Sequence, residues 1–452
     1  MTNWSSRLSA LIPGGCHTYS RGSDQFPSNA PQMLDRGDGC HVWDAEGRKF
    51  LDYGMGLRSV GLGYCFEPVL EQVNKELYKG NNLPRATRTE LEAAEKFVSL
   101  FDFVDMVKFA KNGSNVTTGA LKLARAFTGK KLIAIPRQQP FFSFDDWFIG
   151  STEIKRGIPS EHSSNTLLFD YGDIDSVIAL FEEHEGHIAA ILLEPVTHLF
   201  PCSAECSDPI ISGLSKCLQC PNKSKNFLHQ LKVVCEKYNA LLIFDEMITG
   251  FRFDIGGAAA FFGVEPDLCT FGKAMANGFS VAALGGRQEI MSLGGIERAD
   301  QERTFLMSTT HGAEMIGLRA FVATASFYET NPVIDHLWDY GVRLKRGFES
   351  LITKHSLTEY FKIYGSPVTL NFLALNSYAQ EDRALKTLFL QEMVKNGVLM
   401  SWISVSYSHG ERELKYTLDA IDHSLTVCKQ ALGDVPSYLN GPEIKPVFRR
   451  YN

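Results

Sequence analysis

Apolar runs and helical periodicities alternate along the middle of the chain, from about residue 85 to about residue 330. The runs with strand character are 107–110, 131–135, 189–193, 241–244 and 268–271. Runs that are apolar at nearly every position suit strands buried on both faces, as in a parallel sheet covered by helices. Their alternation with helical segments predicts an α/β fold with a mostly parallel sheet.

Two helices in this region are placed by their own patterns. Residues 90–100 have helical spacing, with Leu91 and Phe97 on the apolar face that we expect to be buried. A second helix begins at Gly113 and ends before Gly129, a residue type that is favoured just after a helix. Both helices fit the expected layers that cover a parallel sheet.

The two ends of the chain show different patterns. Residues 43–52 predict two short strands around a Glu-Gly turn, within an N-terminal segment (1–75) rich in Gly, Asp and aromatic residues. A helix over 332–352 is followed by strand–helix–strand–helix patterns. We therefore expect a large domain (76–330), a smaller C-terminal α+β domain (331–452), and an N-terminal segment that packs on the small domain and the active site.

Composition excludes several classes of protein. The chain has 452 residues, 44% hydrophobic residues, 21% charged residues and a net charge of −7. That balance is ordinary for a globular protein and offers no cationic field for nucleic acid or for an anionic membrane. The sequence has no run of 18 apolar residues, and because its first residues lack a cationic segment followed by a long apolar one, we expect no secretory signal. We expect a cytoplasmic protein.

An acid and an amine follow two of the apolar runs. Asp245 ends the run 241–244, and Lys273 comes after the run 268–271 and a glycine. Two parallel strands would bring both groups to the same edge of a sheet. A pyridoxal phosphate site needs a carboxylate for the pyridinium nitrogen and a lysine that forms a Schiff base with the aldehyde. The pattern therefore predicts a pyridoxal phosphate enzyme.

The sequence around these two residues resembles one enzyme family. DEMITGFR, from Asp245, and FGKAMANG, from Phe271, resemble the class III (subgroup II) aminotransferases, in the glutamate-1-semialdehyde 2,1-aminomutase branch. The resemblance extends over nearly the whole chain. It implies fold type I, with a seven-stranded mostly parallel sheet in the large domain. It also implies pyridoxal 5'-phosphate as cofactor, catalytic roles for Lys273 and Asp245, and a homodimer with shared active sites.

The same resemblance implies a phosphate site at a helix start. LARAFTG at 123–129 matches the family, which fixes the frame of the helix that opens with Gly113, Ser114 and Asn115. The start of a helix offers backbone N–H groups to an anion. Asn115 replaces the acidic residue that is usual in the family, so Gly113 and Ser114 are the firmer candidates.

Four further residues are implied at the cofactor. Phe141 occupies the position of the aromatic residue that stacks on the pyridine ring, although it could instead be plain core. Glu194 ends another apolar strand, either as a site acid or as a hydrogen-bonded strand end. Thr309, with Thr310 as the alternative, matches the threonine that reaches the cofactor phosphate of the other subunit.

The substrate side departs from the aminomutase pattern. Arg21, in PGGCHTYSR, matches the arginine that pairs with a substrate carboxylate, or is a surface residue. Leu57 replaces a tryptophan, Arg58 is an additional arginine, and the segment 150–159 is shorter than the family's gating loop. These departures favour an aminotransferase that acts by ping-pong transfer between an amino donor and another ketone or aldehyde. Analogy suggests sugar, polysaccharide or secondary metabolism.

Two other functions are weighed against this one. The first is an isomerase, either glutamate-1-semialdehyde 2,1-aminomutase or another pyridoxal phosphate isomerase, which would need no separate amino acceptor. The second is a regulatory protein that binds pyridoxal phosphate or a metal without catalysis. The presence of both Lys273 and Asp245 argues against the second.

Four cysteines are crowded into a short insertion. Cys202, Cys206, Cys217 and Cys220 lie among Ser, Pro, Gly and Lys residues. Four thiols at this spacing are typical of a structural zinc site, which would order a segment of low apolar content. Free thiols, an iron–sulfur cluster and a redox role are the alternatives.

Overall fold

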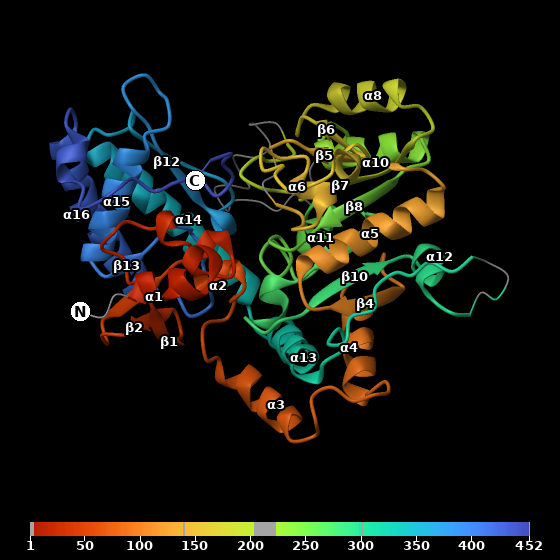
Figure 1. Ribbon diagram of the computed structural model, residues 1–452. Helices are drawn as coiled ribbons and strands as arrows, with labels where there is room; N and C mark the ends of the chain where they lie inside the picture. The colour runs from red at the N-terminus through yellow and green to blue at the C-terminus, as the bar shows by residue number, and fades with distance from the viewer. Residues whose placement is uncertain (1–3, 139–140, 203–222, 298, 300–301, 452) are drawn as a thin grey trace. The chain divides into compact units, whose positions relative to one another are not determined.

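The computed structural model describes residues 4–138, 141–202, 223–297, 299 and 302–451, and Figure 1 shows its elements. The chain divides into two compact units. The large unit is Glu67–Ile334, and the small unit combines Met1–Phe66 with Asp335–Asn452.

A seven-stranded sheet forms the centre of the large unit. Its strand order is β4-β10-β9-β8-β7-β5-β6. The strands are β4 (Met106–Ala110), β5 (Leu132–Pro136), β6 (Thr166–Phe169), β7 (Ile188–Leu193), β8 (Leu241–Asp245), β9 (Leu268–Phe271) and β10 (Ala282–Gly286). β10 runs in the opposite direction to the other six strands of this sheet. The predicted α/β fold with a seven-stranded, mostly parallel sheet is confirmed.

Helices cover both faces of this sheet. α5 (Gly113–Thr128) leads from β4 to β5, whereas α8 (Ile174–Glu183) and α10 (Phe227–Lys237) lead from β6 to β7 and from β7 to β8. The first crossover runs along the strand order in the opposite direction to the other two. Because parallel crossovers are right-handed, α5 lies on one face, and α8 and α10 lie on the other (Figure 1). Every residue of β7 and β8 is consequently buried.

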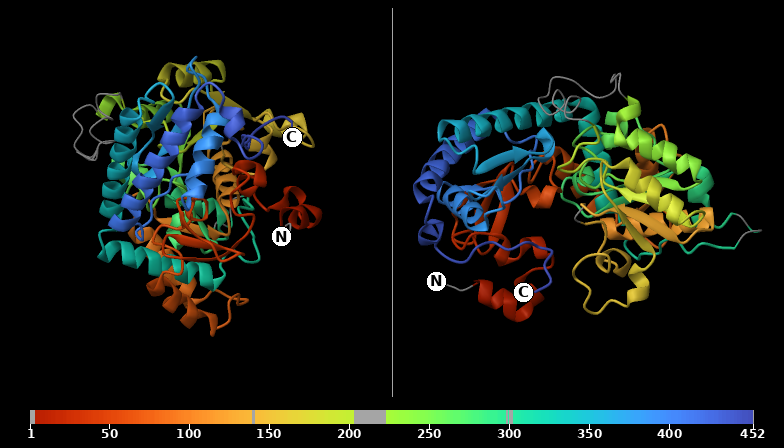
Figure 2. Two further views of the ribbon diagram at one scale, coloured as in Figure 1. Left: turned by 90° about the vertical axis from the view of Figure 1, so that its left-hand side faces the viewer. Right: turned by 90° about the horizontal axis from the view of Figure 1, so that it is seen from above.

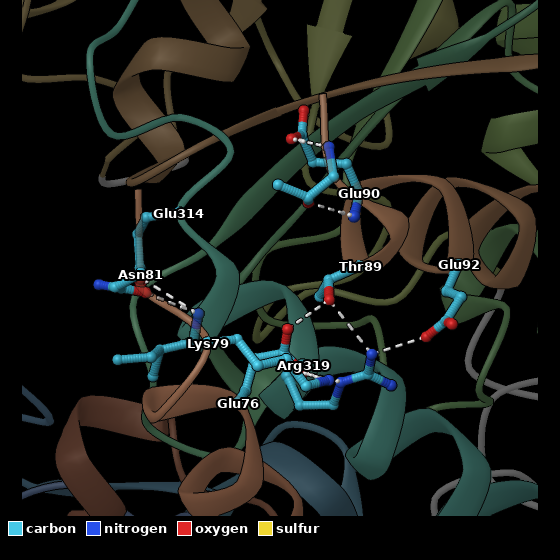
Figure 3. Close-up of polar contacts among 10 residues, drawn as sticks. Glu76, Lys79, Asn81, Thr89, Glu90, Glu92, Glu314 and Arg319 are labelled. Atoms are coloured by element: carbon cyan, nitrogen blue, oxygen red, sulfur yellow. Dashed lines mark hydrogen bonds and ion pairs between the residues drawn. The ribbon is translucent and has the colours of Figure 1, made fainter. Parts of the chain in front are cut away.

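A network of charged side chains joins three helices of the large unit (Figure 3). The helices are α3 (Glu67–Leu77), α4 (Arg88–Ser99) and α13 (Met315–Thr330). Arg319 on α13 contacts Glu76 on α3 at 3.2 Å and Glu92 on α4 at 2.6 Å. Thr89 donates to Glu76 at 2.6 Å. These bonds hold a buried carboxylate among three helices.

The buried face of α4 differs from the one expected. Thr89, Ala93 and Phe97 are buried, whereas Leu91 is 59% exposed. The helix is present and Phe97 faces the core, but the expected burial of Leu91 is wrong for this chain. The packing of α13 against α4 determines which stripe is covered, and periodicity alone does not reveal it.

The small unit combines the two ends of the chain in one sheet. Its strand order is β1-β2-β3-β13, and β13 runs parallel to β3. The strands are β1 (Leu34–Asp38), β2 (His41–Asp44), β3 (Lys49–Asp52) and β13 (Val398–Leu399), with a separate pair β11 (Phe361–Tyr364) and β12 (Asn371–Ala374). The two strands expected within 43–52 are β2 and β3.

Three long helices accompany these strands. They are α14 (Val333–Lys354), which begins two residues before the small unit, α15 (Arg383–Lys395) and α16 (Glu411–Ala431). α15 and α16 pack side by side (Figure 2). The shorter helices of the chain are α1 (Trp4–Leu11), α2 (Met55–Arg58), α6 (Asp146–Ile149), α7 (Ser160–Ser163), α11 (Gly257–Phe262) and α12 (Gln288–Met291). In the described ranges, none of these helices has the length and apolarity needed to span a bilayer.

Candidate functional site

One edge of the seven-stranded sheet gathers the residues expected at the cofactor. β4, β7, β8 and β9 point the same way, so the segments that follow them meet at the carboxyl edge. Gly113 opens the helix after β4, and Glu194 follows β7. Asp245 ends β8, and Lys273 comes two residues after β9. Ligands of open α/β sheets bind at this edge.

Asp245 is a buried carboxylate held from one side. Its side chain belongs to a residue that is 2% exposed. The described hydrogen bonds, from the N–H of Met247 and the hydroxyl of Thr270, both reach Oδ1 at 3.1 Å. Burial raises the pKa of Asp245 to about 6, although the charge of Lys273 and the two hydrogen bonds oppose that rise. A cation at Oδ2 would restore the ionised form.

Lys273 lies on a tight turn beside that carboxylate. β8 and β9 are in register with Asp245 opposite Thr270, which brings the turn after β9 close to the end of β8. Lys273 has a φ of 45°, in the left-handed region that non-glycine residues seldom occupy. Such strain is typical of functional positions, where the surrounding structure holds the backbone. Lys273 is half-buried, and its charge acts on Asp245.

The start of α5 can receive an anion. The side chain of Asn112 caps the helix and accepts the N–H of Asn115 at 3.0 Å. The N–H groups of Gly113 and Ser114 precede it and have no intrahelical acceptor, so they can bind phosphate oxygens. Ser114 is 3% exposed, and its Oγ accepts the N–H of Phe144 at 3.1 Å, which leaves the hydroxyl proton able to donate.

Two residues at this edge escaped the sequence analysis. Thr270 binds Asp245, yet a single polar residue within an apolar strand gives no signal of its own. Met247 lies against two glycines, since a Cβ at Gly113 would approach its Sδ to 3.1 Å and a Cβ at Gly272 to 2.6 Å. Its position two residues after Asp245 could have suggested it.

The neighbouring acid, Glu246, serves another purpose. It is fully buried, accepts the N–H groups of Ala258 and Ala259 at 2.9 and 2.8 Å, and accepts the hydroxyl of Thr249. Burial raises the pKa of Glu246 to about 7, against these hydrogen bonds. This carboxylate anchors the start of α11, and the sequence did not distinguish that role from a catalytic one.

The remaining cofactor candidates differ in exposure. Glu194 is 5% exposed, whereas Phe141 is 48% exposed. The ring of Phe141 makes an edge contact with that of Phe148, with the ring centroids 5.8 Å apart. Thr309 and Thr310 are exposed on a loop before α13. All four belong to the large unit, and their roles toward the cofactor stay predictions.

The two arginines expected to bind substrate belong to the small unit. Arg21 is exposed at the end of a short helical turn, and Arg58 is half-buried. Met55, Gly56, Leu57 and Arg58 have consecutive φ values of 41°, 58°, 58° and 69°. Left-handed residues in sequence are costly, so this turn is a strained feature.

A buried acid holds this turn in place. Asp52 accepts the N–H groups of Gly54 and Met55 at 2.8 and 2.9 Å. The hydroxyl of Tyr64 donates to Asp52 at 2.8 Å and accepts the N–H of Gly56 at 2.8 Å. Burial raises the pKa of Asp52, although these hydrogen bonds lower it in part.

The cysteine segment is described only at its first residue. Cys202 is half-buried, and its Sγ accepts from the side-chain amide of Asn226 at 3.0 Å. Cys206, Cys217 and Cys220 lie outside the described residues.

Comparison with known proteins identifies the family. The chain matches the family "Aminotransferase class-III" over residues 25–170 and 220–403. The chain belongs to the class-III aminotransferases. Its relatives include a glutamate-1-semialdehyde 2,1-aminomutase from Acetivibrio thermocellus, 30% identical over 92% of this chain and 95% of that protein. They also include a 3-aminobutyryl-CoA aminotransferase from Cloacimonas acidaminovorans (strain Evry), 29% identical over 93% of this chain and 95% of that protein.

Solved structures share the fold. The pyridoxal phosphate (PLP) form of the FumI protein from Sphingopyxis sp. MTA144 has a TM-score of 0.82 and 23% identity, over 97% of this chain and 99% of that one. An omega-transaminase from Sphaerobacter thermophilus has a TM-score of 0.78 and 23% identity, over 94% of this chain and 97% of that one. These likenesses confirm the fold-type I architecture.

Membership in this family makes the protein a PLP-dependent enzyme, an aminotransferase or an aminomutase. The chain's own residues fit the cofactor. Asp245 is a buried carboxylate that needs a cationic partner, and Lys273 presents an amine beside it. The start of α5, at Gly113 and Ser114, offers donors to a phosphate at the same sheet edge.

Proposed function

We propose that the protein transfers an amino group by a ping-pong mechanism, from an amino donor to a ketone or aldehyde acceptor. The observation that carries this proposal is the meeting of Asp245, Lys273 and the start of α5 at one sheet edge. Bound pyridoxal phosphate supplies the electron sink for the carbanion that forms when the substrate Cα loses its proton.

Each residue of the chain then has a defined task. Nζ of Lys273 would hold the cofactor through its aldehyde, and its free amine would accept and return the proton of the substrate Cα. Asp245 keeps the ring nitrogen protonated, with Thr270 and the N–H of Met247 fixing its Oδ1. Gly113 and Ser114, with Asn115 beside them, would hold the phosphate, and Phe141 and Glu194 would contact the ring.

The substrate is proposed to carry an anionic group. Arg21 and Arg58 are the candidate guanidinium groups, since a planar fork suits a carboxylate or phosphate. Support for Arg58 comes from the strained turn at Met55–Arg58, which Asp52 and Tyr64 hold in one geometry. Analogy places the reaction in sugar, polysaccharide or secondary metabolism.

The second candidate is glutamate-1-semialdehyde 2,1-aminomutase. Several relatives bear that name at 27–30% identity. Leu57 and Arg58, where the aminomutases have Trp-Gly, favour transfer to another carbonyl compound over isomerisation.

A homodimer with shared active sites completes the proposal. Thr309 and Thr310 are exposed in the single chain, as expected of residues that reach a partner's cofactor phosphate. Replacing both by alanine is expected to weaken cofactor binding without changing the fold. Unchanged cofactor affinity would overturn their assignment.

The four-cysteine segment is proposed as a structural zinc site on its spacing alone. Elemental analysis of the purified protein should find one zinc per chain whose presence depends on Cys202, Cys206, Cys217 and Cys220. Replacement of Cys217 and Cys220 by serine should remove it. An unchanged zinc content would contradict this assignment.

Single-turnover spectroscopy with a panel of amino donors tests the main proposal. A productive donor should remove the long-wavelength absorption of the bound cofactor and release one equivalent of keto product, with none in Lys273→Ala. Isomerisation of a semialdehyde or diamino compound without any acceptor would instead establish the aminomutase. A protein that binds no pyridoxal phosphate would exclude both.

A further inference from the structure

Three metal-ligating side chains meet in the small unit, among residues that have no role at the cofactor. Sγ of Cys40, a ring nitrogen of His41 and a carboxylate oxygen of Glu413 lie within 4.8 Å of one another. The distance from Sγ of Cys40 to Nδ1 of His41 is 3.8 Å. Sulfur and nitrogen ligands of one tetrahedral zinc ion lie about 3.5 Å apart, given bond lengths of about 2.3 and 2.0 Å.

We propose that Cys40, His41 and Glu413 bind a divalent zinc-class cation, with water in the fourth position. A thiolate, an imidazole and a carboxylate are the ligand types that zinc takes in proteins. The thiolate and the carboxylate together offset both charges of the ion. His41 and Glu413 are half-exposed, so the ion has a route from solvent.

The backbone around these ligands is fixed. Cys40 is 2% exposed, and its C=O accepts the N–H of Asp52 at 2.9 Å. His41 is paired in the sheet on both sides, with Asp38 and with Leu51. A site whose ligands stand on a sheet loses little conformational freedom when the ion enters.

Glu413 is held as firmly as the strand residues. It lies in the first turn of α16, and its Oε2 accepts the N–H of Gly410 at 3.1 Å. That capping bond orients the side chain and leaves Oε1 for the ion. Metal binding therefore requires little rearrangement of this carboxylate.

Binding exchanges a proton for the metal. Burial raises the pKa of Cys40 to about 12, with a further contribution from Glu413, so the thiol is protonated in the absence of the ion. On binding, the S–H bond breaks, an S–metal bond forms and the proton passes to solvent. Lys49 and Arg412 contribute positive potential at His41, which weakens the site without removing any ligand.

A second buried histidine lies next to this site. His409 is fully buried, and its Nδ1 accepts the N–H of Ser406 at 3.1 Å. Burial and, to a smaller extent, the charge of His41 lower the pKa of His409 to about 3. The thiol of Cys40 donates to the C=O of Ser408 at 3.3 Å. The segment that carries His409 therefore borders the sulfur ligand.

The ion would tie the two ends of the chain together. Cys40 and His41 come from the N-terminal segment, and Glu413 comes from the last long helix. A cross-link that closes a long loop removes much freedom from the unfolded chain. Metal binding should therefore raise the unfolding temperature of the protein.

Cobalt titration of the PLP-loaded, full-length chain tests the proposal. Cys202, Cys206, Cys217 and Cys220 are first replaced by serine, so that they cannot compete for metal. We expect one Co²⁺ per chain, with visible ligand-field bands at longer wavelength than the cofactor absorbs, a thiolate charge-transfer band and a higher unfolding temperature. No saturable cobalt binding in this background would overturn the proposal.

Four variants locate the site. Cys40→Ser and His41→Asn should each weaken Co²⁺ binding by at least about tenfold. Glu413→Gln should also weaken it, although its amide oxygen can still accept the Gly410 N–H, which separates ligation from capping. Cys65→Ser, at an exposed cysteine, should change nothing. Equal affinity in His41→Asn and in the parent would contradict the assignment, even where Cys40→Ser does not fold.

Discussion

Two buried carboxylates of the large unit, Glu76 and Asp245, are stabilised in different ways. Glu76 is 1% exposed and has its cations within the protein, with Arg319 at 3.2 Å and Lys79 at 3.0 Å (Figure 3). Burial alone would raise the pKa of Glu76, but the bond from Thr89 and these cations lower it overall. Glu76 is a structural residue whose charge is already compensated.

Asp245 is equally buried but incompletely compensated. The two hydrogen bonds described for Asp245 both reach Oδ1, and the nearby positive charge comes from Lys273, the amine proposed to bind the cofactor. The pKa of Asp245 is therefore raised to about 6, whereas the pKa of Glu76 is lowered. The comparison teaches that Asp245, whose neighbouring cation is itself a candidate to bind the cofactor, is the better candidate of the two for a cationic ligand.

Loss of the amine should have the largest effect. Lys273→Ala removes the nucleophile and the charge beside Asp245, so kcat/KM is expected to fall by at least about a thousandfold. Lys273→Arg keeps the positive charge but cannot condense with an aldehyde, and it should be equally inactive. Activity in the arginine variant would show that charge alone matters at this position.

The structural acid should respond to the loss of its cation. Arg319→Met removes one of the two cations that contact the buried carboxylate of Glu76. This change should lower the free energy of unfolding by about 3 kcal/mol. Urea denaturation measures this value. Lys96→Met, which breaks a more exposed pair with Glu329, should cost about 1 kcal/mol or less. Equal effects of the two changes would refute the distinction between them.

A smaller effect is expected from the hydroxyl that binds Asp245. Thr270→Val removes a hydrogen bond to a charged group, worth about 1.5 kcal/mol, so the Kd for pyridoxal phosphate should rise by about tenfold. Thr270→Ser keeps the hydroxyl and should restore the affinity. Fluorescence titration of the cofactor-free protein measures both. An equally weak serine variant would mean that packing, rather than the hydrogen bond, is responsible.

The meeting of Asp245 and Lys273 at one sheet edge could be predicted because its signal is local. Asp245 and Lys273 directly follow apolar strands, and parallel strands bring such residues to a common edge. Arg319 and Glu76 could not be paired, since they lie on separate helices that only tertiary packing brings together. The burial of Leu91 was predicted wrongly for the same reason, because the packing of α13 determines which face of α4 is buried.

The backbone at the candidate substrate residues was less predictable from the sequence than the placement of the candidate cofactor residues. The turn at Met55–Arg58 has left-handed backbone at three non-glycine positions, which no propensity predicts. Asp52 and Tyr64, which flank the turn in the sequence, hold it by accepting the N–H groups of Gly54, Met55 and Gly56. Such strain becomes visible only once the surrounding hydrogen bonds are known.

The most direct test measures the free energy of unfolding of cofactor-free wild type and Asp245→Asn from pH 4 to pH 8. The folded-state pKa of Asp245, about 6, lies above its ordinary value of 3.8, so the carboxyl stabilises most at low pH and loses that contribution as pH rises through 6. The stability of Asp245→Asn relative to wild type should therefore increase by up to about 3 kcal/mol across this range.

Glu76→Gln is the matched control and should show the opposite trend. The pKa of Glu76 lies below its ordinary value of 4.5, so its stabilisation is present above that pH and is lost on acidification. Saturating pyridoxal phosphate should reverse the trend at Asp245, because the ring cation lowers the pKa of that carboxyl. A pH-independent difference between wild type and Asp245→Asn, unchanged by the cofactor, would contradict the assignment of Asp245 as the partner of the cofactor ring.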